Sequence, residues 1–137
     1  MPFVIDASIA ISWALDDEEH PTAALSLDRI RNDEARVPGL WWYEVRNALV
    51  TNERRRRLTE DDTAAFLQAL SRLALTLDHD ADDLQTLALA RRYGLTIYDA
   101  VYLELARREN IPLATLDGKL ANAARVEKVP LIEDIAL

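Results

Sequence analysis

Short apolar runs alternate with longer amphipathic segments along this chain, and that alternation restricts the fold more than any other feature of the sequence. The apolar runs have the length of buried strands and fall at residues 3–5, 36–38, 76–78, 112–116 and 130–132. The intervening segments have helical periodicity and cover residues 7–16, 20–34, 40–57, 59–75, 80–94, the stretch that carries Asp99, and 118–126. Short buried strands separated by helices are typical of parallel sheets with helices packed on both faces. We therefore predict an α/β fold of three layers, with a short, mostly parallel sheet in the middle.

The composition fits a single globular domain, which we expect to span residues 1–137. The chain has no cysteine, which excludes disulfides and thiolate metal sites and is typical of a reducing cytoplasm. It has no apolar run approaching the roughly 20 residues that span a bilayer, and its first residues lack the features of a signal peptide. We therefore expect a cytoplasmic protein without a membrane partner. The net charge of −8 argues against a protein that coats nucleic acid, but not against an enzyme that binds it through a local patch and a metal.

Two aspartates lie where predicted strands end and helices begin. Asp6 directly follows the strand at 3–5, and Asp117 precedes the helix at 118–126. The carboxyl ends of parallel strands are where α/β sheets bind their ligands. Each aspartate alone is also explained as a helix N-cap, because its side chain can accept a backbone N–H bond there. Two caps and a possible active site are both compatible with these positions.

A third aspartate, Asp99, falls on the apolar side of a helical wheel. In the stretch "TIYDAVYLELA", Tyr98 and its apolar neighbours fill one arc, and Asp99 lies within the range of that arc. Glu104, Arg107 and Arg108 occupy the opposite side, which we expect to be solvated. An acid that faces the core at the start of a helix is harder to explain as a cap, so we expect Asp99 to be buried for a functional reason.

A fourth acid, Glu44, begins a narrow polar stripe on the helix predicted at 40–57. Glu44, Asn47 and Thr51 are spaced i, i+3 and i+7, so they lie along one edge of the apolar face. Arg54 and Arg55 continue the same side of the helix. A solvated surface stripe explains this pattern equally well, but acid, amide, hydroxyl and arginine in a row suit a cleft with a metal at one end and phosphates further out.

Four motifs of this chain together resemble those of the PIN-domain ribonucleases, and specifically the VapC-type toxins of bacterial toxin–antitoxin pairs. The motifs are "VIDASIAISWAL", "YEVRNAL", "LTIYDAVYLELA" and "LATLDGKL", in that order along the whole chain. Each motif is weak alone, but the four in sequence are specific. Matched position by position, the acidic quartet of the family falls on Asp6, Glu44, Asp99 and Asp117. Thr115 matches a hydroxyl that supports the acidic site, and Asn47 matches a frequent amide next to it.

The resemblance implies a PIN-like fold and a Mg²⁺-dependent endoribonuclease that hydrolyses phosphodiester bonds of a structured RNA such as tRNA or rRNA. It also implies a VapB-like antitoxin as a partner and a homodimer. The acids themselves agree with a metal, because two like charges about 4 Å apart repel by about 4 kcal/mol at an effective dielectric near 20. Oxygen ligands without cysteine or a nearby histidine favour Mg²⁺ or Mn²⁺ over zinc. His20 and His79 lie in polar stretches, and we expect both at the surface.

Three other functions are compatible with parts of the sequence. A phospho-receiver domain also uses an acidic Mg²⁺ pocket on a parallel sheet, but it needs adjacent acids after the first strand, and "VIDAS" has one. A non-catalytic interaction module would use the acids only as helix caps. A housekeeping PIN nuclease for RNA processing is the alternative within the enzyme class. Of the adjacent Trp41 and Trp42, we expect one in the core and the other at a protein–protein surface or also in the core.

Overall fold

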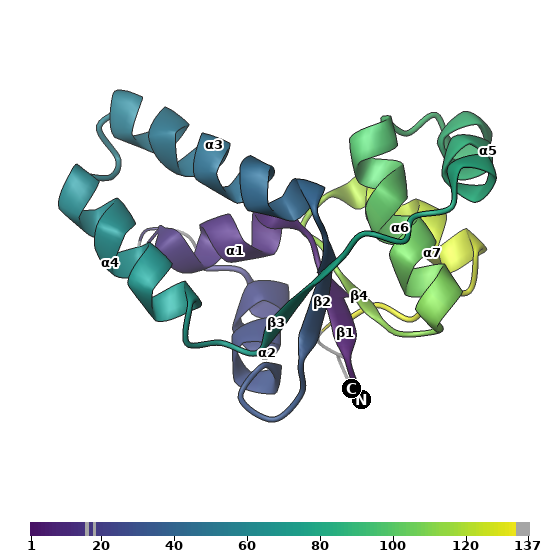
Figure 1. Ribbon diagram of the computed structural model, residues 1–137, viewed down its shortest axis with the longest axis horizontal. Coiled ribbons are helices and arrows are strands. Elements are labelled where there is room, and N and C mark those ends of the chain that lie inside the picture. Colours follow the sequence, from purple (N-terminus) through teal and green to yellow (C-terminus); the bar gives the residue numbers. More distant parts are fainter. Residues whose placement is uncertain (16, 18, 134–137) are drawn as a thin grey trace.

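The structure is a computed structural model, and it describes residues 1–15, 17 and 19–133. These residues form a parallel sheet between two groups of helices (Figure 1). In chain order the elements are β1 (Phe3–Ile5), α1 (Ala7–Ala14), α2 (Pro21–Arg29), β2 (Ala35–Pro38), α3 (Leu40–Arg54), α4 (Glu60–Leu70), β3 (Leu75–Asp78), α5 (Asp83–Tyr93), α6 (Ile97–Glu109), β4 (Leu113–Ala114) and α7 (Gly118–Val126). The predicted three-layer α/β fold is confirmed.

The sheet has the strand order β3-β2-β1-β4, and all of its strand pairs are parallel. Helices α1 to α4 lie to one side in Figure 1, and α5, α6 and α7 lie to the other. Helix α6 packs against β1, β2 and β4, so it covers the middle of its face of the sheet. Because the strands are parallel, their carboxyl ends share one edge, and the segments that leave β1 and β4 there begin α1 and α7.

The strands form where apolar side chains are enclosed on both faces. Phe3, Val4 and Ile5 of β1 are fully buried, as expected for the inner strand of a sheet covered by helices on both sides. The helices end and begin at residues suited to those positions. Helix α5 ends at Gly94, which has the left-handed φ of 63° that favours glycine. Helix α6 begins after Thr96, whose hydroxyl caps the helix.

Several predicted boundaries were wrong, and in two helices the predicted end is instead a turn that leads into a strand. The predicted helix at 20–34 ends at Arg29, since Ala35–Pro38 joins the sheet. The predicted helix at 59–75 ends at Leu70, since Leu75–Asp78 pairs with β2 along its whole length. Two further helices were drawn too long: α1 ends at Ala14, with residue 16 outside the described residues, and α3 ends at Arg54. The strand predicted at 130–132 is only a single bridge between Leu131 and Leu113.

The faces of α6 differ from the simple amphipathic pattern. Glu104, predicted to be solvated, is 2% exposed, whereas Tyr98, predicted to be apolar core, is 60% exposed. The reason is that α6 packs against the sheet on one side and against α5 and α7 on others, so most of its residues from Ala100 to Ala106 are buried. A wheel with one buried face does not describe a helix enclosed in this way. None of the described helices is both long and apolar enough to cross a membrane.

Candidate active site at the carboxyl edge of the sheet

Asp6 is the most enclosed acid at the carboxyl edge of the sheet. It follows β1 directly and serves as the N-cap of α1, accepting the backbone N–H of Ile9 at 3.3 Å. Its side chain is only 5% exposed. The hydroxyls of Ser8 and Thr115 donate to its two carboxylate oxygens, one to each. Asp6 is therefore held in one orientation by three hydrogen bonds.

The same hydroxyls connect the end of β1 to the segment after β4. The Thr115 hydroxyl, besides donating to Asp6, accepts the backbone N–H of Asp117 at 3.0 Å. The Ser8 hydroxyl accepts the backbone N–H of Leu116 at 3.0 Å. Asp117 is exposed and caps α7 by accepting the N–H of Leu120 at 3.0 Å. Two acids that are far apart in the sequence thus share one hydrogen-bonded frame.

Asp99 lies in the first turn of α6 and is not the cap of that helix. Thr96 caps α6, and the N–H of Asp99 donates to the Thr96 hydroxyl at 3.1 Å. The prediction that Asp99 is buried was wrong, because the residue is half-buried and the start of the helix is open to solvent. Its position in the first turn still favours a negative charge through the helix dipole. Capping therefore explains Asp6 and Asp117 in part, and Asp99 takes part in the cap of α6 only through its hydrogen bond with Thr96.

Glu44 reaches the edge from α3. It is half-buried, and its Oε1 accepts a hydrogen bond of 2.5 Å from the hydroxyl of Tyr102 on α6. The ring of Tyr102 is buried, and its hydroxyl joins α6 to α3 across 58 positions of the chain. The four predicted acids therefore come from the segments after β1 and β4 and from two helices.

The pKa values of three of these acids are raised, and the causes show that their charges act on one another. Burial raises the pKa of Asp6 to about 6, and the charge of Asp99 adds to the effect against the opposing hydrogen bonds of Ser8, Thr115 and Ile9. Burial also raises the pKa of Glu44, again with a contribution from Asp99. The pKa of Asp99 is raised by burial and by the charge of Asp117, while Lys119 opposes the rise. Asp99 is thus electrostatically coupled to all three other acids.

The chemistry of this edge fits a divalent cation with oxygen ligands. Carboxylates that raise each other's pKa are stabilised in their charged form by a nearby cation, and neither histidine nor cysteine contributes to the cluster. Within residues 1–15, 17 and 19–133, no three Asp, Glu or His side chains are gathered closely enough to hold one ion. Mg²⁺ is commonly bound by only one or two carboxylates and several waters, so this spacing is compatible with it.

Comparison with known proteins shows what this architecture is. Residues 3–126 match the model of the PIN domain. The chain belongs to the PIN-domain family. It is 33% identical over 135 residues to a Pyrobaculum aerophilum protein named Ribonuclease VapC3, covering 96% of this chain and 98% of the relative. The predicted resemblance to VapC-type PIN domains is therefore confirmed.

Solved structures agree with this PIN-domain fold. A crystal structure of a Pyrobaculum aerophilum protein superposes with a TM-score of 0.71 at 23% identity, covering 90% of this chain and 84% of that one. A toxin–antitoxin complex from Klebsiella pneumoniae superposes with a TM-score of 0.56 at 21% identity, covering 83% and 85%. At these identities the likeness concerns the fold alone.

The other predicted site residues of this PIN domain lie along α3. Asn47 is exposed, and Arg54, in the last turn, is about 15 Å from Glu44 along the helix axis at 1.5 Å per residue. Arg55 caps α3 and lies beyond the regular helix, so the helical wheel applies to Arg54 but not to Arg55. Both arginines are exposed, and neither side chain has a hydrogen bond or ion pair with any described residue. Arg57, in contrast, pairs with Asp17 at 3.1 Å.

The two tryptophans differ as one of the sequence interpretations proposed. Trp41 is 3% exposed and belongs to the core, whereas Trp42 is 44% exposed. The exposed indole contacts the ring of Tyr43, which is itself 68% exposed, and lies under the guanidinium of Arg46 at 3.9 Å. His20 and His79 are exposed, as expected.

Sequence reasoning missed three residues at the acidic edge. Ser8 follows Asp6 by two positions, which is the spacing of a short local hydrogen bond to a carboxylate, so that signal was available. Tyr102 was assigned only to the apolar arc of its helix, and its hydroxyl carried no sequence signal. Lys119 is the cation that acts on Asp99, and its Nζ lies 3.5 Å from where a side chain on Gly94 would begin. Only the packing of α7 against α6 brings Lys119 to this position.

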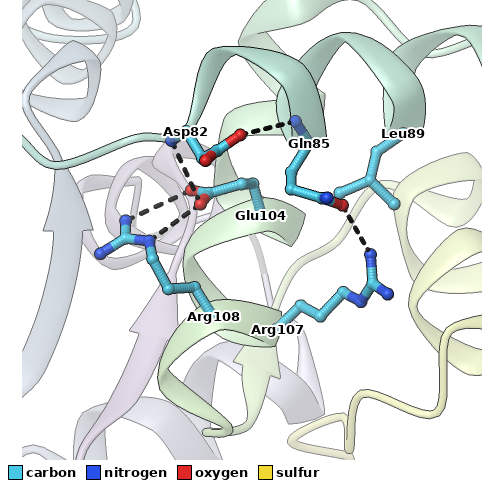
Figure 2. A pocket seen from close by; sticks show the side chains of 6 residues that line it. All are labelled: Asp82, Gln85, Leu89, Glu104, Arg107 and Arg108. Atoms are coloured by element: carbon cyan, nitrogen blue, oxygen red, sulfur yellow. Dashed lines mark hydrogen bonds and ion pairs between the residues drawn. The ribbon is translucent and has the colours of Figure 1, made fainter.

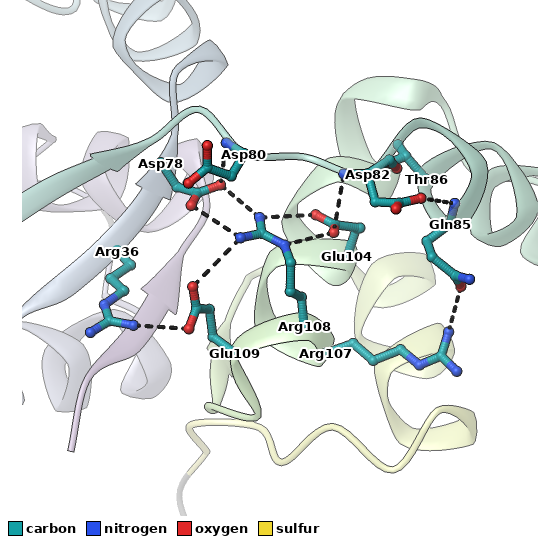
Figure 3. Close-up of polar contacts among 10 residues, drawn as sticks. All are labelled: Arg36, Asp78, Asp80, Asp82, Gln85, Thr86, Glu104, Arg107, Arg108 and Glu109. Atoms are coloured by element: carbon teal, nitrogen blue, oxygen red, sulfur yellow. Dashed lines mark hydrogen bonds and ion pairs between the residues drawn. The ribbon is translucent and has the colours of Figure 1, made fainter.

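A second cluster of charges lies between α5 and α6, around the buried Glu104. Glu104 accepts from Arg108 at 2.8 Å and from the backbone N–H of Asp82 at 3.3 Å, as Figure 2 shows. Arg108 also binds Asp78 at the end of β3, at 2.7 Å, and Figure 3 shows that it lies at the centre of this network. The adjoining pocket has a volume of about 310 Å³. Because its charged groups satisfy one another, the cluster fastens the β3–α5 connection to α6 and is distinct from the acidic edge.

Proposed function

We propose that this PIN domain is a Mg²⁺-dependent endoribonuclease that acts as the toxin of a VapBC-type toxin–antitoxin pair. The observation that carries the proposal is the arrangement of four acids at the carboxyl edge of the sheet: the enclosed Asp6 and the cap Asp117 share the hydroxyl of Thr115, Glu44 is bonded to Tyr102, and Asp99 lies one turn before Tyr102 on α6. Burying acids that repel one another destabilises the fold, and a bound cation would reverse the sign of that repulsion. A purely structural role as helix caps leaves Glu44 without an explanation, and it does not account for the repulsion of Asp99 by the other acids.

In this proposal Asp6, Glu44, Asp99 and Asp117 are the carboxylates available to Mg²⁺, or to Mn²⁺ as a substitute, and an ion bound by one or two of them would complete its coordination with water. Such an ion lowers the pKa of a bound water and stabilises negative charge on a phosphodiester. Ser8 and Thr115 fix the orientation of the Asp6 carboxylate through the hydrogen bonds described above. Lys119 supplies positive charge beside Asp99, in a position to attract a phosphate of the substrate.

RNA is the substrate that we propose, with a structured RNA such as tRNA or rRNA as the target. The relative that covers nearly the whole chain is named a ribonuclease. Because the net charge is −8, binding depends on local cations, and the exposed, unpaired Arg54 and Arg55 are suited to bind phosphates away from the acids. Asn47 lies on α3 between the two groups.

The proposal includes a VapB-like antitoxin, a homodimer and a cytoplasmic site of action. A toxin–antitoxin complex is among the structures that share the fold. The exposed Trp42 and Tyr43 on α3 are the kind of aromatic side chains that protein–protein interfaces bury, and we place the homodimer contact there.

The test is metal-dependent cleavage of RNA together with metal binding. The purified protein is incubated with bulk tRNA and rRNA in Mg²⁺, in Mn²⁺ and in EDTA, and the products are separated on a denaturing gel. We expect cleavage within the chain of the RNA in Mg²⁺ or Mn²⁺ and none in EDTA. Cleavage that is equal in EDTA would reject the metal, and an absence of cleavage in all three conditions would reject the nuclease.

A thermal-shift titration tests metal binding without relying on activity. Binding to the folded state alone stabilises a protein by RT ln(1 + [L]/Kd). The melting temperature of the wild type should therefore rise with Mn²⁺ concentration, whereas that of the Asp6→Asn, Asp99→Asn double variant should not. Equal changes of melting temperature in both proteins would show that these acids do not bind the ion and act only as helix caps.

A further inference from the structure

The hydroxyl of Tyr102 is the only buried phenol group that contacts an acid of the candidate site among the described residues. Tyr102 lies three residues after Asp99 on α6, so the two side chains leave the same side of the helix. The residue is 1% exposed, and its hydroxyl donates to Oε1 of Glu44 at 2.5 Å. The phenol thus reaches from the core to the acidic edge.

The surroundings keep this hydroxyl a hydrogen-bond donor. Burial raises the pKa of Tyr102 far above its usual value, and the hydrogen bond to Glu44 and the charges of Glu44 and Asp6 raise it further, against the opposing effect of the Ala7 backbone N–H. The Tyr102 hydroxyl is hydrogen-bonded to Glu44 on α3. Asp6 and Ala7, at the start of α1, also affect its pKa.

Glu44 depends on this contact for its orientation. It is half-buried, and the only hydrogen bond that its carboxylate receives from the described residues is the one from Tyr102. A glutamate side chain has three rotatable bonds, and fixing them costs rotamer entropy. Asp6, by comparison, is a short side chain with three hydrogen bonds. Glu44 is therefore the acid whose position is set most by a single neighbour.

We propose that Tyr102 is a positioning residue of the acidic site: its buried hydroxyl holds the Glu44 carboxylate toward Asp99 and Asp6, leaving the second carboxylate oxygen free for a divalent cation. This inference rests on the proposed function, because it assigns the cation to the same four acids. Groups that hydrogen-bond to metal ligands orient those ligands and raise their affinity. Tyr102 acts through Glu44 and does not itself touch the substrate.

The test is Tyr102→Phe, which removes the hydroxyl and keeps the ring. Mn²⁺ alone is titrated into the full-length protein and followed by calorimetry and by thermal shift. We expect the Mn²⁺ affinity to fall about 10- to 100-fold, the usual range for losing such an outer contact. In a Glu44→Ala background the same substitution should change the affinity less than twofold, because the residue that Tyr102 positions is already absent.

Tyr93→Phe is the matched control. The hydroxyl of Tyr93 on α5 also donates to a glutamate, Glu127 at the end of α7, but that pair is not part of the acidic edge. We expect Tyr93→Phe to leave Mn²⁺ affinity and RNA cleavage unchanged. When RNA cleavage is measured over a range of RNA concentrations, Tyr102→Phe should lower kcat while KM stays within twofold, because the hydroxyl does not touch the RNA.

The outcomes separate this inference from the proposed function. A wild type that binds Mn²⁺ but cleaves no RNA rejects the nuclease, and the Mn²⁺ titrations still decide the role of Tyr102. If Tyr102→Phe matches Tyr93→Phe in Mn²⁺ affinity, or lowers it equally with and without Glu44, Tyr102 is not a positioning residue. Failure of Tyr102→Phe to fold would equally overturn the inference, since it would assign the hydroxyl to the stability of the fold. A wild type that neither cleaves nor binds Mn²⁺ overturns both.

Discussion

Asp6→Asn should make the metal-free protein more stable at neutral pH, and by an amount that depends on pH. The substitution removes the charge of an acid that is 5% exposed and keeps its shape. Asparagine is as good an N-cap as aspartate, so the bond from the Ile9 N–H can remain. The variant loses the ability to titrate and one of the two oxygens that accept from Ser8 and Thr115, and only the first of these losses depends on pH.

The magnitude follows from the pKa of Asp6, which burial raises from 3.8 to about 6. At about 1.4 kcal/mol for each pKa unit, this difference corresponds to roughly 3 kcal/mol. The folded state holds the Asp6 proton more tightly than the unfolded state does. The resulting stabilisation of the wild type is complete below about pH 4 and is lost as the pH rises through about 6. The unfolding free energy of Asp6→Asn minus that of the wild type should therefore increase by up to about 3 kcal/mol between pH 4 and pH 7.

Urea denaturation in EDTA at several values between pH 4 and pH 8 measures this difference directly. Most other acids titrate alike in the two proteins, so their contributions cancel in the comparison. Asp28→Asn is the control, because Asp28 is 79% exposed and paired only with the exposed Arg31 at 3.5 Å. Its difference from the wild type should stay within about 0.5 kcal/mol at every pH, as for exposed pairs in general. A flat profile for Asp6→Asn, like that of the control, would refute the conclusion that burial and repulsion destabilise the Asp6 charge.

Three further predictions test other parts of the molecule. Asp99→Asn should abolish RNA cleavage in Mg²⁺ while leaving the melting temperature in EDTA unchanged or higher, because it removes a charge that raises the pKa of Asp6 and Glu44; near-normal cleavage would remove Asp99 from the site. Arg54→Gln should weaken RNA binding and reduce the slope of log K against log salt by about 0.7, the value for one phosphate contact on a single strand. Arg56→Gln should leave the slope unchanged, because Arg56 lies past the end of α3 with a left-handed φ of 60°. Equal slopes for the two variants would contradict the direction assigned to Arg54. Glu104→Ala should lower the unfolding free energy, measured in urea, by about 2–3 kcal/mol. This loss is somewhat smaller than the loss on breaking a fully buried ion pair, because Arg108 keeps Asp78 as a partner. A loss below about 0.5 kcal/mol would show that the Glu104 network contributes little.

The sequence by itself determined the architecture and the placement of Asp6 and Asp117 at one edge of the sheet. Short apolar runs between helical segments specify a sheet covered on both faces, and β1 and β2 lie within two residues of where that pattern put them. Asp6 and Asp117 follow strands in the sequence, so a parallel sheet necessarily brings them to one edge. These inferences succeeded because periodicity and chain order can be read directly from the sequence and are the same in the folded protein.

The tertiary structure alone decided how each charged group is surrounded. Asp99 and Glu104 lie five positions apart on one helix, yet the acid expected to be buried is half-exposed and the acid expected to be solvated is enclosed. The difference arises because α5 covers Glu104 and supplies the N–H of Asp82, while the first turn of α6 has no such cover. The Tyr102 hydroxyl likewise bonds to Glu44 only because the fold brings this part of α6 close to α3. Burial and the dielectric around a charge depend on which distant segments pack against it, and a helical period contains no information about those neighbours.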